Sequence, residues 1–345
     1  MGIFVLLFFA GNFLNAAPGT TAADFLKIGL GPRPAALGDA YTGLADDVNA
    51  IAHNPAGLMS LRRQEATFMH HEYAEGIEQD YLAYAYPVSR SGALGFAVNA
   101  LRTQAIASYD ANDQPLDSVS ARDLSANAAV AFKIKRLALG LSAKRLSSRL
   151  ADVKASGLAT DAGLLVNINN NLRFGAAAQN LGSDIKFIKE SFPLPSIFKT
   201  GVALRTLLPF TAGHYGTLAV DRHFPRGESA YSSAGLEIIS LKLLALRIGY
   251  NEDRSLGHGL SLGAGIKLTN REFFKYSAYQ GSPTFPDIEI DYAFADFGDF
   301  GQTHRMAMSV RFGPDKHAQK TIKDLGPREI PPDPKKTNKK YYGIQ

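Results

Sequence analysis

The sequence of 345 residues contains no cysteine and no tryptophan. The absence of cysteine excludes a disulfide-stabilised scaffold, thiolate metal sites and cysteine nucleophiles, so a metal site would have to use histidine and carboxylates. Charged residues make up only 20% of the chain and hydrophobic residues 46%, which fits one large domain or two ordinary ones. Glycine is abundant, and all aromatic rings apart from histidine belong to phenylalanine and tyrosine.

Long apolar runs are also missing. The run from Ile3 to Ala10 is too short to span a bilayer as a helix. Small residues follow at Ala16 and Ala17, which is the layout of a secretory signal peptide, although no Lys or Arg precedes the run. We therefore expect a signal peptide over residues 1–16. No later stretch approaches the roughly 20 apolar residues of a membrane helix, so an exported chain of this kind is either soluble or a membrane barrel.

The net charge of +5 comes mostly from residues 314–345, which hold eight Lys or Arg and four acidic residues and so contribute +4. The remainder is close to neutral, which argues against a nucleic-acid partner. The segment is rich in proline and poor in apolar residues, so we expect a flexible basic tail on the periplasmic side. It serves either as a solvated tether or as a docking segment for an acidic partner.

Between Gln64 and Gly313 apolar and polar residues alternate with a period of two. In residues 124–134 one face carries Leu, Val, Phe and Ile, and the other carries Ser, Asn, Ala and Lys. A soluble β-sandwich has large charged residues on its polar face, whereas here that face consists of small residues with spaced charges. This pattern is typical of outer-membrane barrels, which have lipid outside and a polar interior. The charges that we expect to face the lumen include Lys199, Arg205, Arg247, Lys267 and Arg305.

The alternation divides into fourteen strands, and a closed bacterial barrel requires such an even number. We therefore predict an all-β fold, a 14-stranded antiparallel outer-membrane barrel over residues 64–313. Short periplasmic turns alternate with longer outward connections at 104–122 and 182–194; a long connection at 270–287 falls on the short-turn side as an insertion. The predicted strands are 65–74, 78–88, 92–103, 123–135, 137–149, 156–168, 172–181, 195–207, 214–224, 229–239, 243–253, 259–269, 288–297 and 303–313.

Without tryptophan, the aromatic girdles at the two membrane interfaces have to be built from tyrosine and phenylalanine. The tyrosines that the strand pattern assigns to these girdles are Tyr81, Tyr84, Tyr86, Tyr250 and Tyr292.

A barrel of this width needs a filler unless its lumen is a channel, and residues 17–63 are available for that purpose. Apolar residues recur there at helical spacing, which predicts a small helical hatch; they are Leu37, Tyr41, Leu44, Val48 and Ile51. Asp46 or Asp47 can cap a helical turn, and Asn54-Pro55 ends it, because proline disfavours a helical conformation at the residue before it. Gly57 then permits a tight exit toward the first strand.

The run GPRPAALGDAYTGLADDVNAIAHNPAGL, from Gly31 to Leu58, is followed by fourteen predicted strands that close with IDYAFADFGDFGQTHRMAMSVRFG, from Ile290 to Gly313. These features resemble the PorV/PorQ family of outer-membrane proteins, a branch of the FadL-type barrel superfamily. The resemblance implies a multi-pass barrel in the bacterial outer membrane whose lumen is filled by an N-terminal hatch. Asn54, Pro55 and Ala56 match the hatch motif, next to Gly57 and after Asp46 and Asp47.

The resemblance implies one of two roles. The first is a part in type IX secretion or cell-surface assembly, with a secretion translocon and exported cargo as partners. The alternative is a FadL-like channel for the uptake of long-chain fatty acids or other hydrophobic molecules. Outer-membrane lipid surrounds the barrel in either case.

No catalytic, metal or cofactor site is predicted. Gly259-Leu-Ser261-Leu-Gly263 matches the nucleophile elbow of hydrolases, but that elbow needs a strand, a sharp turn and a helix, whereas strand alternation here continues to Leu268. His70 and His71 are adjacent on a strand and therefore point to opposite faces. We expect a protein that is not an enzyme.

Overall fold

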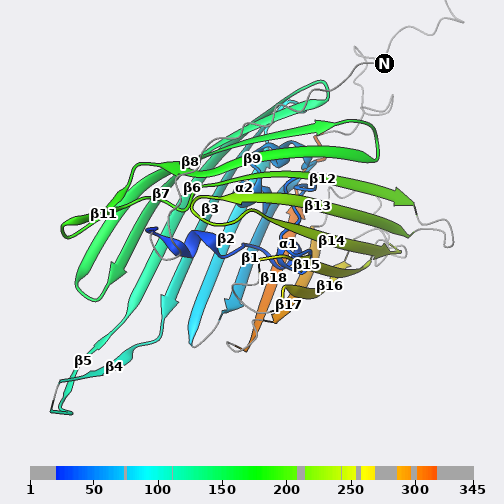
Figure 1. Ribbon diagram of the computed structural model, residues 1–345. Coiled ribbons are helices and arrows are strands. Elements are labelled where there is room, and N and C mark those ends of the chain that lie inside the picture. Colours follow the sequence, from blue (N-terminus) through cyan, green and yellow to red (C-terminus); the bar gives the residue numbers. More distant parts are fainter. Residues whose placement is uncertain are drawn as a thin grey trace, which may run out of the picture.

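The computed structural model describes residues 21–73, 76–110, 112–207, 214–241, 243–253, 258–268, 286–296 and 301–316. Fourteen of its strands form a closed antiparallel barrel (Figure 1). These strands are β1 (Gln64–Glu72), β2 (Ile77–Pro87), β3 (Gly92–Thr103), β6 (Ala121–Ile134), β7 (Leu137–Leu150), β8 (Val153–Asn167), β9 (Leu172–Gly182), β12 (Ile197–Leu207), β13 (Tyr215–Pro225), β14 (Tyr231–Ser240), β15 (Leu244–Asn251), β16 (Leu260–Leu268), β17 (Asp287–Asp296) and β18 (Gln302–Phe312).

The barrel closes through the pairing of β1 with β18, in which Gln64 lies opposite Phe312 and Glu72 opposite His304. Every other strand pairs with its neighbours along the chain. The predicted fourteen-stranded barrel is thus confirmed, and each strand begins and ends within three residues of its predicted bounds. The period-two pattern was sufficient to locate the strands, because one face of every strand is apolar and points outward while the other is polar and points into the lumen.

The two long outward connections each contain a β-hairpin of their own. Strands β4 (Ile106–Tyr109) and β5 (Pro115–Val119) form one, and β10 (Ile185–Phe187) and β11 (Glu190–Phe192) form the other. Figure 1 shows the β4–β5 hairpin extending away from the barrel rim. We call the end of the barrel that bears these hairpins the hairpin end, and the opposite end, which bears most of the short connections, the turn end.

Three predicted segments lie wholly or mostly outside the described residues. The signal peptide, residues 1–16, belongs to them. Residues 270–285 of the predicted insertion and residues 317–345 of the predicted tail do as well.

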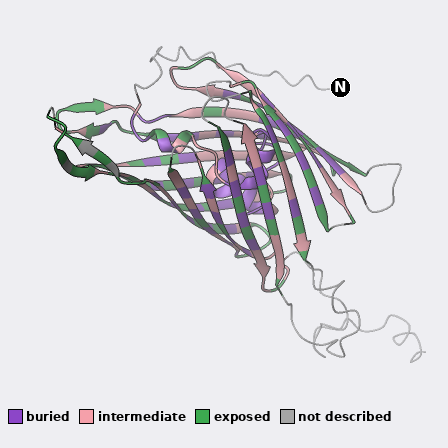
Figure 2. Ribbon diagram, turned by 90° about the horizontal axis from the view of Figure 1, so that it is seen from below, coloured by how far each residue is buried: buried purple, intermediate pink, exposed green. Residues whose placement is uncertain are grey.

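The outer surface of the barrel is apolar, and the inner surface is polar. Exposed and buried residues alternate along the strands, as the bands in Figure 2 show. On β6 the exposed positions include Val130 and Phe132, whereas Ser125 and Asn127 are buried. A strand that exposes its large apolar side chains while it buries amide and hydroxyl groups is typical of a barrel in lipid.

One tyrosine assigned to the interfacial girdles was placed wrongly. Tyr81 is only 1% exposed and faces the lumen, on the same buried face of β2 as Ala83 and Ala85. Its neighbours at even positions, Tyr84 and Tyr86, lie on the other face. The strand alternation separates the two sets, since successive side chains point to opposite faces.

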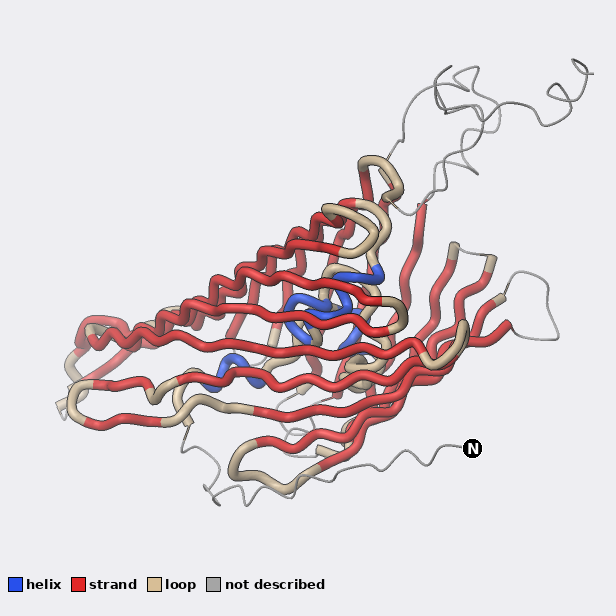
Figure 3. Tube along the Cα trace, turned by 90° about the horizontal axis from the view of Figure 1, so that it is seen from above, coloured by secondary structure: helices blue, strands red, loops and turns tan. Residues whose placement is uncertain are grey.

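The hatch lies inside the ring of strands (Figure 3). It contains η1 (Asp24–Lys27), α1 (Pro32–Ala36), α2 (Ala50–His53) and η2 (Pro55–Ser60). The helical spacing of residues 37–51 does not give a continuous helix, because residues 37–49 form turns that include Gly38 and Asp39, which both have positive φ. The predicted short helical turn before Asn54-Pro55 corresponds to α2. The five residues of the predicted stripe are nonetheless buried in the core. Among the described residues, no helix has the length and apolarity needed to cross a membrane.

Glycines on the inner wall allow the backbone of the hatch to lie directly against the barrel. A Cβ on Gly140 would collide with the backbone of Pro55 and Ala56, and one on Gly175 would collide with the Thr42 carbonyl. A Cβ on Gly249 would meet the backbone between Leu37 and Gly38 in the same way. The small residues of the polar face are therefore docking positions for the hatch.

We predict that Gly140→Ala releases η2 without unfolding the barrel. The added methyl group overlaps the hatch backbone, and overpacking of this kind costs about 1–3 kcal/mol. Proteinase K should cleave residues 50–60 roughly ten-fold faster in the purified variant, while the heat-dependent shift in gel mobility of a folded barrel persists. Gly92→Ala is the matched control, since its Cβ would make only an ordinary contact with Ser89. Equal cleavage of both variants would contradict a close hatch–wall contact.

Candidate functional site

The strongest link between the hatch and the barrel is the guanidinium of Arg33 in α1. Its Nε donates to Glu237 on β14 at 2.8 Å, and its Nη1 donates to Asp46 at 2.6 Å and to Asp47 at 2.8 Å. The guanidinium carbon also lies 5.7 Å from the centre of the Tyr41 ring. Pro32 and Pro34 favour the start of this short helix, because their backbone angles are already fixed near helical values. Arg33 of α1 thus joins the carboxylates of Asp46 and Asp47, later in the hatch, to the carboxylate of Glu237 on the wall.

The ion pairs continue along the wall toward the turn end. Glu237 also accepts from Arg247 at 2.8 Å, and Arg247 binds Asp291 at 2.5 Å. Beyond these, Arg311 pairs with Glu65 at 3.0 Å and with Glu289 at 2.6 Å. The network spans strands on both sides of the seam where β1 meets β18, so one connected set of charges anchors the hatch and braces the closure of the barrel.

The charges around Asp46 change its acidity. Burial alone would raise the pKa of Asp46, but the positive charges of Arg33, Arg205 and Arg173 lower it far below its ordinary value. Burial would likewise lower the pKa of Arg33, and its acidic neighbours raise it well above the usual value. Both groups are therefore charged throughout the neutral range. Because the pKa of Asp46 is depressed, its stabilising contribution is complete at neutral pH and is lost only as the pH falls toward that lower value.

Asn54 connects three parts of the structure. Its side-chain amide donates to the Thr42 carbonyl at 2.9 Å and to the Leu164 carbonyl of β8 at 3.1 Å. Its side-chain oxygen accepts from the Ala56 amide at 3.3 Å, which caps η2. Pro55 and Ala56 lie against Gly140 and Gly163 of the wall. The motif therefore fixes the hatch to the inner wall through backbone contacts.

The remaining predicted hatch residues support the turns on either side. Asp47 accepts a hydrogen bond from the Asn49 amide at 2.8 Å just before α2, so its side chain organises the start of that helix. Gly57 lies against Ala45 and Ala50, where a Cβ would clash. Asp46 bridges Arg33 and Arg205.

The five predicted lumen charges have different surroundings. Arg247 belongs to the wall network, and Arg205 pairs with Asp46 at 2.8 Å. Arg305 is 7% exposed and lies near His71. Lys199 and Lys267 are partly buried, and neither forms an ion pair within the part of the chain that the structure describes. The structure therefore connects Arg205 and Arg247 to the Arg33 network and leaves the other three outside it.

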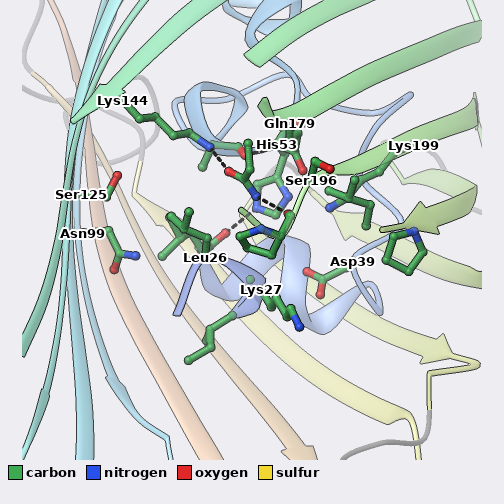
Figure 4. A pocket seen from close by; sticks show the side chains of 18 of the residues that line it. Leu26, Lys27, Asp39, His53, Asn99, Ser125, Lys144, Gln179, Ser196 and Lys199 are labelled. Atoms are coloured by element: carbon green, nitrogen blue, oxygen red, sulfur yellow. Dashed lines mark hydrogen bonds between the residues drawn. The ribbon is translucent and has the colours of Figure 1, made fainter. Parts of the chain in front are cut away.

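An enclosed polar chamber of about 130 Å³ lies between the hatch and the wall (Figure 4). The segment Leu26–Leu30 forms one side of it. Lys144, Lys199, Asn99 and Gln179 contribute polar groups from four strands. The buried oxygens of Tyr81 and Asn99 have no hydrogen-bond partner among the described residues, so the chamber offers polar atoms that a solute or water can bind.

His53 closes one side of this chamber. Its Nε2 atom lies 2.7 Å from the Leu30 carbonyl oxygen, and its ring packs edge-on against Tyr41. Burial, together with the nearby charge of Lys199, lowers the pKa of His53 below its ordinary value. The ring is therefore neutral at pH 7 and donates its Nε2 proton to the Leu30 carbonyl.

The hairpin end holds a larger, open vestibule of about 1390 Å³. Its lining includes Phe25 of η1 and the aromatic rings of the β10–β11 hairpin, Phe187 and Phe192. Phe25 is buried in an apolar cluster with Leu146, Ile185 and Leu194. The vestibule and the polar chamber are adjacent. They share residues of the hatch and of the wall: Lys27, Ile28, Gly29, Asp39, Glu228, Tyr231 and Asp253.

Two residues that matter for the site were not singled out from the sequence. Arg33 looked like an ordinary residue in a proline-rich stretch. Asp221 accepts hydrogen bonds from the backbone amides of Tyr41 and Thr42, at 2.9 and 2.7 Å. The position of Asp221 on the inward face of β13 could have identified it from the sequence, because acidic residues on that face need partners. Nothing local in the sequence indicated that its partners are the amides of Tyr41 and Thr42.

The residues considered for chemistry lie apart. His71 is buried in the lumen, whereas His70 binds Asp80 on the outer face at 2.8 Å. Ser261 lies within β16 and not at a strand-to-helix turn. Among the described residues, no group of three or more His, Asp or Glu is arranged to hold a metal ion.

Residues 15–192 match the model of an uncharacterised protein family, UPF0164. A sequence comparison with curated proteins gives no match. Among solved structures, the chain is similar to the CymD monoaromatic hydrocarbon channel, with 12% identity, a TM-score of 0.53 and coverage of 85% of this chain and 99% of that chain. It is also similar to a deltaS2 mutant of the TodX monoaromatic hydrocarbon channel, with 11% identity, a TM-score of 0.50 and coverage of 82% and 97%.

A Pseudomonas aeruginosa FadL homologue matches 81% of this chain and 96% of its own, with 10% identity and a TM-score of 0.43. At these identities the likeness to the two hydrocarbon channels shows the fold. The expected closed barrel fold is therefore confirmed, while the FadL superfamily and its PorV/PorQ branch stay predictions.

We predict that Arg33→Met loosens the hatch. The substitution leaves Glu237 and Asp47 without their shared guanidinium in a buried setting, where loss of one partner costs about 3–5 kcal/mol. Hydrogen–deuterium exchange of residues 40–60 should rise by at least ten-fold in the purified variant. Adding Glu237→Gln should recover part of the protection, because it removes one of the buried carboxylates that lost Arg33, although Glu237 still pairs with Arg247.

Lys27→Met is the control for this experiment. Lys27 pairs with Glu228 at 2.9 Å, but the lysine side chain is 36% exposed, and such surface pairs contribute little. Its exchange profile over residues 40–60 should equal that of the unmodified protein. If Arg33→Met gives that same profile, the Arg33 contacts do not hold the hatch.

Proposed function

The chain belongs to the uncharacterised protein family UPF0164, and from this premise and its fold we propose that it is an outer-membrane channel for hydrophobic small molecules with a polar end. Long-chain fatty acids are the leading candidates. The observation that carries this proposal is the succession of a large open vestibule, with aromatic rings along one side, and a smaller polar chamber next to it.

The vestibule suits the capture of an apolar chain. It opens at the hairpin end, and aromatic rings of Phe187 and Phe192 lie along it. Ligand sites are usually apolar clefts with a few well-placed polar groups. The vestibule volume of about 1390 Å³ accommodates a molecule of this kind without any movement of the barrel wall.

The chamber suits a polar or anionic group. Lys199 lines it and has no ion-pair partner in the described residues; the carboxamides of Asn99 and Gln179 line it as well. Lys144 is already neutralised by Asp161 at 2.9 Å. The amine of Lys199 is therefore the cation best placed to bind a carboxylate that enters from the vestibule.

The hatch closes the route toward the turn end. Its core packs against the wall from Leu37 to Leu61, and Arg33 and Asn54 fix it there. Passage through the barrel consequently requires the hatch to shift. The ion pairs of Arg33 are the contacts whose loss would permit such a shift.

We predict that the purified protein binds oleate and that Lys199→Met weakens this binding. A hydrogen bond to a charged group contributes about 1.5–3 kcal/mol, so the affinity should fall roughly ten- to a hundred-fold. Lys267→Met is the matched control, because Lys267 also faces the lumen but does not line the chamber. Binding can be measured with radiolabelled oleate in detergent and with uptake by cells that lack other fatty-acid channels. Absence of oleate binding to the unmodified protein would overturn the proposal.

A second candidate function is the PorV/PorQ role in type IX secretion or surface assembly. The supporting observation is the pair of hairpins at the hairpin end, whose Tyr109 and Ile188 are 61% and 74% exposed. Large apolar side chains at loop tips are suited to contacts with protein partners. In this role the barrel would be an anchor, and the hatch would have no need to move.

We predict that, in this second role, a tagged protein recovered from outer membranes carries a translocon component or exported proteins. Replacement of residues 106–119 by a Gly-Ser linker should then abolish the recovery. Recovery of lipid alone would exclude the secretion role. The tag, placed at the chain end, also tests our proposal that the basic tail of residues 314–345 is periplasmic: antibodies added to intact cells should not bind it.

A further inference from the structure

Four basic residues lie in a row across the outside of the barrel near the hairpin end. The strand register places Arg102 opposite Arg122, Arg122 opposite Arg149, and Arg149 opposite Lys154. The row therefore crosses β3, β6, β7 and β8. Neighbouring strands are about 4.8 Å apart, so the row is roughly 15 Å long.

These residues belong to the outward-facing set of their strands. Arg149, at the end of β7, also borders the vestibule, and its Nε donates to the Ala151 carbonyl at 2.9 Å. Ser148 and Ala155, each adjacent in sequence to a row member, are buried on the inner wall. Because successive residues alternate between the two faces, Arg149 and Lys154 point outward. All four basic residues are exposed.

Such an arrangement is unfavourable without a counter-charge, since like charges directly opposite each other in a sheet destabilise it. Arg102 is neutralised by Glu78 and Asp80, at 2.7 Å each. Arg122 and Lys154 form no ion pair with any described residue, and Asp152 in the nearby turn does not pair with them. The remaining excess of positive charge thus faces outward from β6 to β8.

The height of the row on the barrel coincides with a membrane interface. From Ile134 to Ala126, β6 presents only apolar or small residues on its outer face, a length of about 30 Å along the strand. With the usual tilt of 35–45° this corresponds to roughly 20–25 Å of height, the size of the apolar band of an outer-membrane barrel. Arg145 lies opposite Ala126, at the upper border of that band.

Between Arg145 and the row, the outer surface is polar on β7 and β8, whereas β6 presents Leu124. Ser147 and Ser156 lie opposite each other on the outer face of β7 and β8. Ser147 is the next outward-facing residue of β7 after Arg145. Below them, Leu141 and Leu158 are 56% and 64% exposed. The surface thus combines apolar side chains, two hydroxyl groups and a set of cations in the order in which an amphipathic molecule would meet them.

We propose that this surface binds an anionic lipid of the surrounding leaflet, with its phosphate groups on Arg122, Arg145, Arg149 and Lys154. The serine hydroxyls donate further hydrogen bonds to the phosphate oxygens, and the acyl chains lie against the leucines below. Arginine and lysine are the side chains best suited to phosphate, the first through paired hydrogen bonds and the second as a point charge. A lipid is favoured over a soluble anion because the cations adjoin the apolar band directly.

Basic residues elsewhere near the hairpin end have acidic neighbours, so the excess of positive charge among the described residues is restricted to β6–β8. On β13, Arg222 bonds to Ser232 at 2.7 Å and lies 3.4 Å from Glu252. On β1 and β2 the outward polar residues are His70, Glu78 and Asp80, which are mostly acidic. A lipid bound at β6–β8 would fix the orientation of the barrel beside the β10–β11 hairpin.

The test compares phosphatidylglycerol with phosphatidylcholine on the detergent-purified full-length protein, with native mass spectrometry as the readout. The unmodified protein should retain phosphatidylglycerol preferentially. The triple variant Arg122→Gln, Arg145→Gln, Lys154→Gln should bind it about a hundred-fold more weakly, since each cation near a membrane surface contributes about a factor of five. Binding of phosphatidylcholine should not change.

Arg222→Gln is the control, because its charge is already balanced by Glu252. The heat-dependent gel shift establishes that every variant is folded. An unmodified protein without a preference for phosphatidylglycerol, or a triple variant that retains it, overturns the proposal. Competition by water-soluble glycerol phosphate at equal concentration would also overturn it, because it would show that the surface binds a free anion and does not require the lipid chains.

Discussion

The structure depends on the neutralisation of charges inside the barrel. The inner wall carries Glu237, Arg247 and Asp291, which would be costly to bury without partners. Arg33 of the hatch completes this set through Glu237 and joins it to Asp46 and Asp47. The same contacts therefore fill the lumen, position the hatch and link its two helical parts.

Close backbone contact makes this neutralisation possible. Arg33 reaches Glu237 at 2.8 Å because the hatch lies directly on wall glycines such as Gly140 and Gly249. A wall of larger residues would hold the hatch away from the strands and leave the carboxylates unpaired. The abundance of glycine and alanine on the inner face is thus a requirement of docking.

The two ends of the barrel differ as a result. The turn end is closed by the packed core of the hatch, whereas the hairpin end contains the open vestibule. The polar chamber lies between them and adjoins the vestibule. This asymmetry supports entry from the hairpin end and a hatch that controls the other end. On the outside, the cations of β6–β8 mark the level at which the hairpin end leaves the apolar band.

The sequence by itself determined the strand count, the strand bounds to within a few residues and the faces of the wall. This succeeded because each strand separates lipid from the lumen along its whole length, so the period-two pattern is strong. It also located the hatch and its Asn54-Pro55-Ala56 turn. Tyr81 was assigned to the wrong face although the alternation around Ala83 and Ala85 gave the correct one.

Only the tertiary structure decided the form of the hatch and the partners of its charges. The helical spacing from Leu37 to Ile51 identified the buried side chains, but the chain reaches the same burial through turns at Gly38 and Asp39 and only a short helix, α2. Arg33 and Glu237 are 204 positions apart, and no local pattern relates them. Their pairing, like the row of cations on four strands, follows from the register of the closed barrel, which brings distant residues to the same height.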